Sequence, residues 1–182
     1  MKQILIVDNH PQNLYLLQAL LQGHGYRVTE ACNGEEALRK AHQEVPALIV
    51  ADILMPVMDG FELCRRWKSD PELRQIPFIF YTATYTDAKD EAFALGLGAD
   101  RFIVKPQEPD TFIAIVRAVL QQFNEEGMTP NTPTLRDETT LVREYNEILI
   151  RKLEDKMAQL EETNHRLQID IEERRRTEER LK

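Results

Sequence analysis

The chain has 182 residues, of which 42% are apolar and 30% are charged, and its formal net charge is −8. This length and apolar content suffice for one sizeable domain with an additional element, whereas the acidic balance argues against nucleic-acid binding, which requires a basic surface. No apolar stretch reaches the roughly 20 residues of a membrane-spanning helix. The cysteines, Cys32 and Cys64, lack metal-binding spacing and are interpreted as small buried residues. We therefore expect a cytoplasmic protein without a membrane segment.

Five short apolar runs alternate with segments of helical periodicity. The runs are ILIV, RVTEA, ALIVA, PFIFY and RFIVK, at residues 4–7, 27–31, 47–51, 77–81 and 101–105. Most are continuous rather than alternating, which is typical of strands buried on both faces. Repeated strand–helix units predict a parallel α/β sheet covered by helices on both sides. Five strands favour the flavodoxin-like (βα)5 fold with strand order 2-1-3-4-5.

The segments that follow these runs carry helix signals. They lie at residues 11–23, 33–44, 59–68, 87–99 and 108–123. Asn33 precedes an acidic first turn and is expected to be an N-cap residue, and Asp59 is interpreted as the cap of the third helix. Together the five strand–helix units place one domain at residues 1–123.

The chain changes character after the fifth predicted helix. Residues 124–140 include one Gly and two Pro residues but hardly any bulky apolar residue, which is typical of a linker. Residues 141–182 contain neither Gly nor Pro. Charges are dense but nearly balanced there, since residues 127–182 hold 11 basic and 13 acidic side chains. This pattern predicts a solvated C-terminal helix over residues 141–182.

Apolar residues in this helix recur at alternating intervals of three and four. They are Ile150, Leu153, Met157, Leu160, Leu167 and Ile171, with Asn164 at one a position of the heptad. An a/d seam of about three heptads predicts a coiled coil. A buried Asn pairs best with its own copy, so we expect Asn164 to set the register of a parallel homodimer through residues 150–171. The alternative is a single helix packed against the globular domain.

Polar side chains end four of the predicted strands. Asp8 follows the first, Asp52 the third and Lys105 lies at the end of the fifth, while Thr82 ends the fourth. The carboxyl ends of parallel strands share one edge of the sheet, where ligands bind in this class of fold. We therefore expect two carboxylates, a hydroxyl and an ammonium group to converge there.

This combination of groups suits phosphoryl transfer. Mg²⁺ binds to few protein ligands, mostly carboxylates, and keeps several waters. A carboxylate beside it is a competent nucleophile toward phosphorus and would form an aspartyl phosphate. Lys105 and the metal would neutralise the phosphoryl oxygens, and the Thr82 hydroxyl could hydrogen-bond one of them.

The segment DILMPVMDG at residues 52–60 resembles the phosphoacceptor segment of two-component response-regulator receiver domains, with an Asp followed three residues later by Met-Pro-x-Met-Asp-Gly. The resemblance covers residues 1–123. It implies that Asp52 accepts phosphate from a histidine kinase or a phosphotransfer domain. It also implies that this segment is a phosphoacceptor switch rather than an enzyme.

The resemblance further implies roles for the surrounding residues. Asp8 and the backbone carbonyl of Leu54 would bind Mg²⁺ together with Asp52. Thr82 would be the switch hydroxyl, Lys105 the phosphate-contacting lysine and Phe102 the switch aromatic residue. The Lys105–Pro106 peptide bond would be cis, as is usual in the family.

Asn9 departs from the family pattern, which has a second acid at this position that binds the metal. Asn offers a neutral amide oxygen instead, so we expect Asn9 to be a weaker Mg²⁺ ligand and phosphorylation to be slower. The alternative is a pseudo-receiver that dimerises and signals without phosphorylation. His10, beside this position, is interpreted as an exposed bystander, with a metal or phosphate contact as the other interpretation.

The C-terminal segment resembles the helices that precede PAS or histidine-kinase modules. This resemblance favours a hybrid sensor kinase or a PAS-containing regulator whose C-terminal module lies beyond Lys182.

A haloacid-dehalogenase-type phosphatase is another class of protein that would form an aspartyl phosphate. Such an enzyme needs a second Asp two residues after its nucleophile. The residues at that distance from Asp52 and Asp8 are Leu54 and His10, so the sequence does not favour this class of phosphatase.

Overall fold

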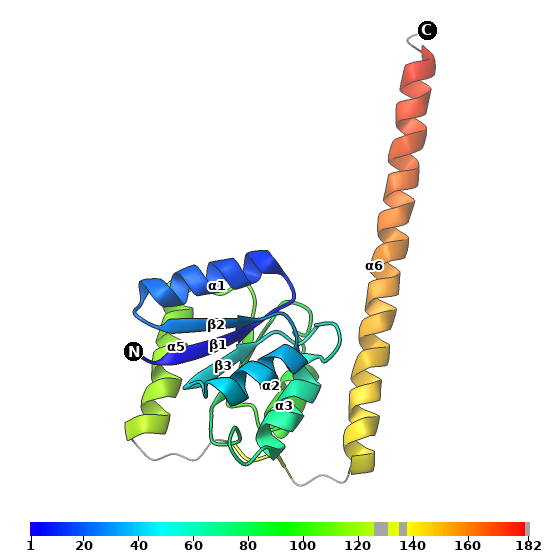
Figure 1. The fold of residues 1–182 in the computed structure, drawn as a ribbon. Coiled ribbons are helices and arrows are strands. Elements are labelled where there is room, and N and C mark those ends of the chain that lie inside the picture. Colours follow the sequence, from blue (N-terminus) through cyan, green and yellow to red (C-terminus); the bar gives the residue numbers. More distant parts are fainter. Residues whose placement is uncertain (126–130, 135–137, 181–182) are drawn as a thin grey trace. The chain divides into compact units, whose positions relative to one another are not determined.

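The computed structural model describes residues 1–125, 131–134 and 138–180 (Figure 1). The chain forms two compact units, one within residues 1–135 and the other within residues 136–182. Parts of the predicted linker and of the predicted coiled coil lie outside the described residues, namely 126–130, 135–137 and 181–182.

The first unit is built on a five-stranded parallel sheet in the order β2-β1-β3-β4-β5. Its strands are β1 (Gln3–Val7), β2 (Arg27–Ala31), β3 (Leu48–Ala51), β4 (Phe78–Thr82) and β5 (Arg101–Val104). This order confirms the predicted flavodoxin-like topology. In the register of the sheet, Val7 pairs with Ala51 and Thr82 with Val104. The carboxyl ends of β1 and β3 are therefore level, as are those of β4 and β5.

Helices cover both faces of the sheet (Figure 1). They are α1 (Pro11–Gly23), α2 (Gly34–Gln43), α3 (Gly60–Ser69), α4 (Ala88–Gly96) and α5 (Pro109–Glu125). Both predicted caps are confirmed, because Asn33 Oδ1 accepts the Glu36 N–H and Asp59 Oδ1 accepts the Glu62 N–H, each at 2.9 Å. Such caps satisfy backbone donors that the first turn of a helix leaves unpaired.

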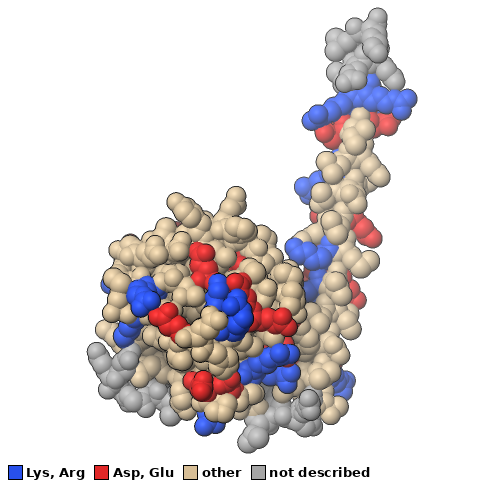
Figure 2. All heavy atoms as spheres, viewed as in Figure 1, with Lys and Arg blue, Asp and Glu red and all other residues tan. Residues whose placement is uncertain are grey.

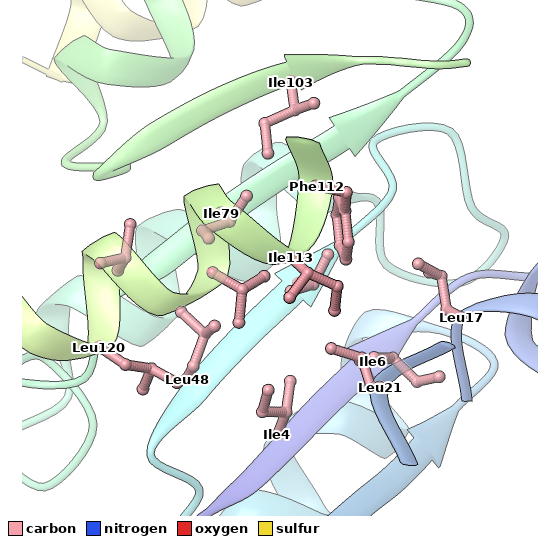
Figure 3. Close-up of a cluster of buried hydrophobic side chains, with 13 residues drawn as sticks. Ile4, Ile6, Leu17, Leu21, Leu48, Ile79, Ile103, Phe112, Ile113 and Leu120 are labelled. Atoms are coloured by element: carbon pink, nitrogen blue, oxygen red, sulfur yellow. The ribbon is translucent and has the colours of Figure 1, made fainter. Parts of the chain in front are cut away.

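One core lies between the sheet and helices α1 and α5 (Figure 3). Alternate strand residues supply it, because successive side chains of a strand point to opposite faces. Its buried members are Ile4, Ile6, Leu17, Leu21, Leu48, Val50, Ile79, Ile103, Phe112, Ile113, Val116, Val119 and Leu120. Burying each such side chain contributes about 1.5–3 kcal/mol, so this layer holds α1 and α5 firmly against the strands.

The opposite face of the sheet packs aromatic side chains against α3 and α4. Phe61 of α3 makes edge-on ring contacts with Phe80 of β4 at 5.6 Å and with Phe93 of α4 at 5.0 Å between centroids. Trp67, the one tryptophan of the chain, is fully buried and contacts Phe78 at 6.0 Å. Edge-to-face pairs of this kind add about 0.5–1.5 kcal/mol to the area that they bury.

Within the predicted linker, residues 124–125 belong to α5 and residues 138–140 to α6, while residues 131–134 pack at the amino end of β5. The Asn131 N–H donates to Asp100 Oδ1 at 2.8 Å, and its Nδ2 donates to the Ala99 carbonyl at 2.9 Å. The Thr134 N–H donates to the Gly96 carbonyl at 3.0 Å. These bonds fix the chain beside the α4–β5 connection after it has left α5.

The described residues of the second unit form a single helix, α6 (Glu138–Arg180). Ion pairs one turn apart run along it, such as Arg143 with Glu147 at 3.2 Å and Arg174 with Asp170 at 3.1 Å. Apart from Asn164, the residues of the predicted a/d seam are exposed apolar side chains, namely Ile150, Leu153, Met157, Leu160, Leu167 and Ile171. Exposed ion pairs contribute only about 0.3–0.5 kcal/mol each, so these pairs add little to the stability of this helix.

Surface features agree with the composition. On the face drawn in Figure 2, acidic and basic side chains are interspersed rather than gathered by sign. Within the described residues, no helix combines the length and apolar character needed to cross a membrane.

The two cysteines differ in burial. Cys64 is buried as predicted, but Cys32 is exposed because it follows the last residue of edge strand β2.

Candidate functional site

The four polar residues predicted at the strand ends come together at one edge of the sheet. Asp8 and Asp52 directly follow β1 and β3, Thr82 ends β4, and Lys105 directly follows β5. The Lys105 Nζ lies 2.7 Å from Asp8 Oδ2 and 3.9 Å from Asp52 Oδ2. Asp8 and Thr82 are almost completely buried, and Asp52 is only 8% exposed. The site is therefore a sunken carboxylate pair with an ammonium group beside it.

Asp8 is held by several donors. Its Oδ1 accepts the His10 N–H at 2.8 Å, and its Oδ2 accepts Asn13 Nδ2 at 2.9 Å as well as Lys105 Nζ. Burial by itself raises the pKa of Asp8, but the bonds from Lys105, His10 and Asn13 outweigh it and hold this pKa below its usual value. Asp8 is therefore a fixed anion whose carboxylate cannot rotate without breaking these bonds.

Asp52 has the opposite electrostatic character. Burial raises its pKa, the Lys105 ammonium partly offsets that effect, and the neighbouring Asp8 charge adds to it. Its Oδ1 is buried and has no hydrogen-bond partner. A buried carboxylate oxygen without a donor carries a desolvation cost, which a cation bound at the site would remove.

These opposite pKa shifts predict a pH-dependent effect of the Asp52→Asn substitution on stability. The pKa of Asp52 in the folded state lies above its value of about 3.9 in the unfolded chain. The Asp52 charge therefore destabilises the fold at pH values above the folded-state pKa. This cost vanishes below the unfolded-state pKa, where the side chain is protonated in both states. We expect the variant to have a higher free energy of unfolding at pH 7 in metal-free buffer. Urea titrations at pH 7 and near pH 3.5 measure the gain, which should shrink at the lower pH. An equal gain at both would contradict the assignment.

The loop from Ile53 to Asp59 is shaped by two backbone features. Gly60 begins α3 so close to β3 that an added Cβ would lie 2.2 Å from the Asp52 carbonyl oxygen. Val57 has φ 69° although it is β-branched, and its side chain is 76% exposed. A β-branched residue in this region is strained, and such strain clusters at functional loops. Gly60 of the DILMPVMDG segment is therefore required, because its backbone lies too close to the Asp52 carbonyl for any side chain to fit between them.

Other predicted site residues lie around this centre. Phe102 on β5 is half-buried, with its ring centroid 6.3 Å from that of Phe80. The Lys105–Pro106 bond is cis as predicted. Leu54 lies in the loop after Asp52 and is 48% exposed. Of the predicted switch residues, Thr82 therefore lies on β4, the strand next to β3, and Phe102 lies one strand further away on β5.

Sequence reasoning missed two contacts of the site. Asn13 carries no sequence signal of a site residue, but its position in the first turn of α1 lets it reach back to Asp8. His10, interpreted mainly as a bystander, has Nδ1 only 3.3 Å from Asp8 Oδ1. Ligand atoms of Asp8, His10 and Asp52 all lie within 4.8 Å of one another. The residues present therefore fit a divalent cation.

Comparison with known proteins agrees with this geometry. Residues 4–117 match the family model described as response regulator receiver domain. The chain belongs to the response regulator receiver family. Members of this family are phosphoacceptor switches rather than catalysts, they are phosphorylated by histidine kinases, and they bind Mg²⁺ at an acidic pocket.

Relatives of this receiver domain include both single-domain and longer proteins. It is 37% identical over 120 residues to Protein PilH of Pseudomonas aeruginosa, covering 66% of this chain and 98% of PilH. It is 40% identical over 141 residues to the alkaline phosphatase synthesis transcriptional regulatory protein PhoP of Bacillus subtilis, covering 75% of this chain and 55% of PhoP. The chain spans about half the length of other curated regulators that it matches.

A solved structure also shows similarity to a receiver domain. The signal receiver domain of a signal transduction histidine kinase from Syntrophus aciditrophicus is 37% identical, with a TM-score of 0.64. The match covers 69% of this chain and 94% of that domain. The receiver fold therefore accounts for about two thirds of the chain, and α6 lies beyond it.

Proposed function

We propose that this receiver domain takes a phosphoryl group onto Asp52 from a histidine kinase or phosphotransfer domain, and that the resulting change passes to a dimeric coiled coil formed by α6. The observation that carries the proposal is the convergence of Asp8, Asp52 and Lys105, with one Asp52 oxygen buried and unpartnered. A cytoplasmic location is part of the same proposal.

The transfer step needs little beyond positioning. An Asp52 carboxylate oxygen attacks phosphorus, the bond from phosphorus to the donor imidazole nitrogen breaks, and the imidazole leaves with the electron pair. An ionised carboxylate needs no general base. Mg²⁺, when bound, supplies charge neutralisation at the phosphoryl oxygens. Asp8, Asn9 and Asp52 side chains and the Leu54 carbonyl would hold it.

Lys105 and Thr82 would then hold the phosphoryl oxygens. Lys105 Nζ bonds Asp8 and lies 3.9 Å from Asp52, so a small shift would bring it to the new anion. The Thr82 hydroxyl accepts the Thr84 N–H at 3.3 Å. Drawing this hydroxyl toward the phosphate would therefore pull on the loop after β4 and leave room for Phe102 to turn inward. This is a local charge change that biases a two-state element.

The α4–β5 region offers a route from the site to the linker. The segment 131–134 is bonded to Gly96 at the end of α4 and to Ala99 and Asp100 in the α4–β5 connection. Gly98 in that connection has φ 102°, and an added Cβ would lie 3.1 Å from the Asn131 carbonyl oxygen. A shift of α4 or β5 would therefore move the chain that leads to α6.

Phosphorylation itself is tested by treating the protein with acetyl phosphate and Mg²⁺ and measuring its intact mass. We expect a phosphoryl adduct, whereas no adduct with acetyl phosphate or with any kinase would favour the pseudo-receiver, which dimerises without phosphate. Beryllofluoride then serves as a phosphoryl mimic. Distances between spin labels on α6, measured with and without it, test whether the helix pair changes.

Dimerisation through the seam gives a separate prediction. Burying a Leu contributes about 1.5–3 kcal/mol, so Leu160→Glu with Leu167→Glu should weaken association at least about a hundredfold. Light scattering over a concentration series measures this. The control, Gln159→Glu with His165→Glu, adds the same charge at b and c positions and should remain dimeric. A wild-type chain that stays monomeric at the highest concentrations would favour the packed single helix.

The surrounding protein is proposed to be a hybrid sensor kinase or PAS-containing regulator. Similarity to a receiver domain from a signal transduction histidine kinase supports this context. The nature of α6, a long charged helix that would connect to a further module, supports it too. Sequencing the gene beyond the codon for Lys182 tests it directly, and a helix-turn-helix domain there would contradict it.

A further inference from the structure

The His10 imidazole adjoins the same candidate cation site, with Nδ1 3.3 Å from Asp8 Oδ1. We propose that His10 binds the metal in place of the acid that position 9 lacks, and that this shifts the site's preference from Mg²⁺ toward first-row transition-metal dications. The inference rests on the proposed function because it concerns the cation site of that function.

The geometry places the imidazole at the cluster. His10 Nδ1 is 3.3 Å from Asp8 Oδ1, and one ligand atom from each of Asp8, His10 and Asp52 falls within a span of 4.8 Å. The His10 N–H also donates to Asp8 Oδ1 at 2.8 Å, which fixes the backbone from which the ring projects. The His10 side chain is 66% exposed. It can therefore turn about its side-chain bonds toward an ion without disturbing the core.

Two buried oxygens at this edge of the sheet have no hydrogen-bond partner. They are Asp52 Oδ1 and Asn9 Oδ1. Asp8 Oδ2 differs, since Lys105 and Asn13 both donate to it. Buried polar atoms are normally paired, and a bound cation would account for both exceptions. The unpartnered Asp52 oxygen is independent of His10 and itself points to a ligand.

The chemistry of the donor set decides which cation is favoured. Mg²⁺ binds to hard, charged oxygen ligands in a near-octahedral arrangement. Asn9 supplies a neutral oxygen, so this site has one negative charge fewer than a site with an acid at that position. An imidazole nitrogen compensates poorly for Mg²⁺ but well for later divalent ions, whose affinities rise from Mn²⁺ through Co²⁺ toward Cu²⁺. Two carboxylates, one amide and one imidazole therefore form a mixed nitrogen–oxygen site.

The test is calorimetric titration of the metal-free full chain with Co²⁺ and, separately, with Mg²⁺. We expect His10→Ala to lower Co²⁺ affinity at least about tenfold and to leave Mg²⁺ affinity nearly unchanged. Losing a residue that only orients a metal ligand already costs about 10–100-fold in affinity, so losing a direct ligand should cost at least the lower value. Asn9→Asp should raise Mg²⁺ affinity. His24→Ala is the matched control, since the His24 ring is exposed and bonds the Leu20 carbonyl at 2.8 Å instead.

Spectroscopy identifies the ligand atom. With Cu²⁺ bound, electron paramagnetic resonance should show nitrogen coupling that His10→Ala removes and His24→Ala keeps. Unchanged Co²⁺ affinity and unchanged nitrogen coupling in His10→Ala would overturn the inference. If acetyl phosphate with saturating Mg²⁺ still labels Asp52 in that case, the proposed function stands while the ligand role of His10 fails.

Discussion

Replacing Asp52 with Asn is expected to reduce phosphorylation by acetyl phosphate and Mg²⁺ to background. The amide nitrogen and oxygen of Asn form no stable acyl phosphate, whereas the Asp52 carboxylate is the one strand-end acid with an oxygen that lacks a hydrogen-bond donor. Asp8 cannot substitute for it, because Lys105, Asn13 and the His10 N–H already engage its oxygens. Intact-mass spectrometry before and after treatment measures the adduct.

Asp59→Asn is the matched control for this substitution. Asp59 lies in the same DILMPVMDG segment, and its Oδ1 caps α3 by accepting the Glu62 N–H at 2.9 Å. Asn is an equally good N-cap residue, so the control should keep both the fold and the adduct. A full adduct in Asp52→Asn, or loss of the adduct in Asp59→Asn, would assign the phosphoacceptor to another residue.

The free energy of unfolding of Asp52→Asn shows whether a lost adduct reflects loss of the nucleophile or loss of the fold. Asp52→Asn is expected to be more stable than the wild type at pH 7 without metal, because it removes a buried charge whose pKa burial raises. A variant that gains stability and loses its adduct has lost the nucleophile rather than the fold. The pairing of these two results makes the role of Asp52 distinguishable from a structural one.

The sequence predicts the sheet and its order well for physical reasons. Continuous apolar runs such as residues 4–7 and 47–51 leave no polar face, so these strands must be covered on both sides. The alternation of strands with helices then restricts the topology to a right-handed parallel sheet. Parallel topology alone brings Asp8, Asp52 and Lys105 to one edge, although the first and the last lie 97 positions apart in the chain.

The contacts that the sequence does not predict depend on side-chain direction. Asn13 reaches Asp8 because of where the first turn of α1 points, and His10 approaches Asp8 because its own backbone N–H bonds that carboxylate. Neither direction is set by periodicity. The bonds of Asn131 to the α4–β5 connection join residues that are 31 and 32 positions apart across a helix and a linker, and no local pattern encodes such a pairing.

The buried ion pair that supports this linker contact carries the largest expected effect on stability. Asp100 is 4% exposed, and its Oδ2 accepts Lys68 Nζ at 3.0 Å and the Phe78 N–H at 2.8 Å, while Oδ1 accepts the Asn131 N–H. Removing one partner of a buried pair costs about 3–5 kcal/mol because the other charge stays buried and unpaired. We expect Asp100→Ala to lower the free energy of unfolding by that amount, measured by urea denaturation.

Trp67 makes this measurement specific to the receiver domain. It is the single tryptophan, it is fully buried, and it precedes Lys68 on α3, so its fluorescence follows the domain and not the long helix α6. The double variant Lys68→Met with Asp100→Ala should recover part of the loss, because the stranded ammonium is gone and only the two backbone donors remain unpaired. If Asp100→Ala lowers the free energy of unfolding by less than about 1 kcal/mol, the range of an exposed ion pair, then water reaches Lys68. In that case the Lys68–Asp100 pair does not hold residues 131–134 at the amino end of β5.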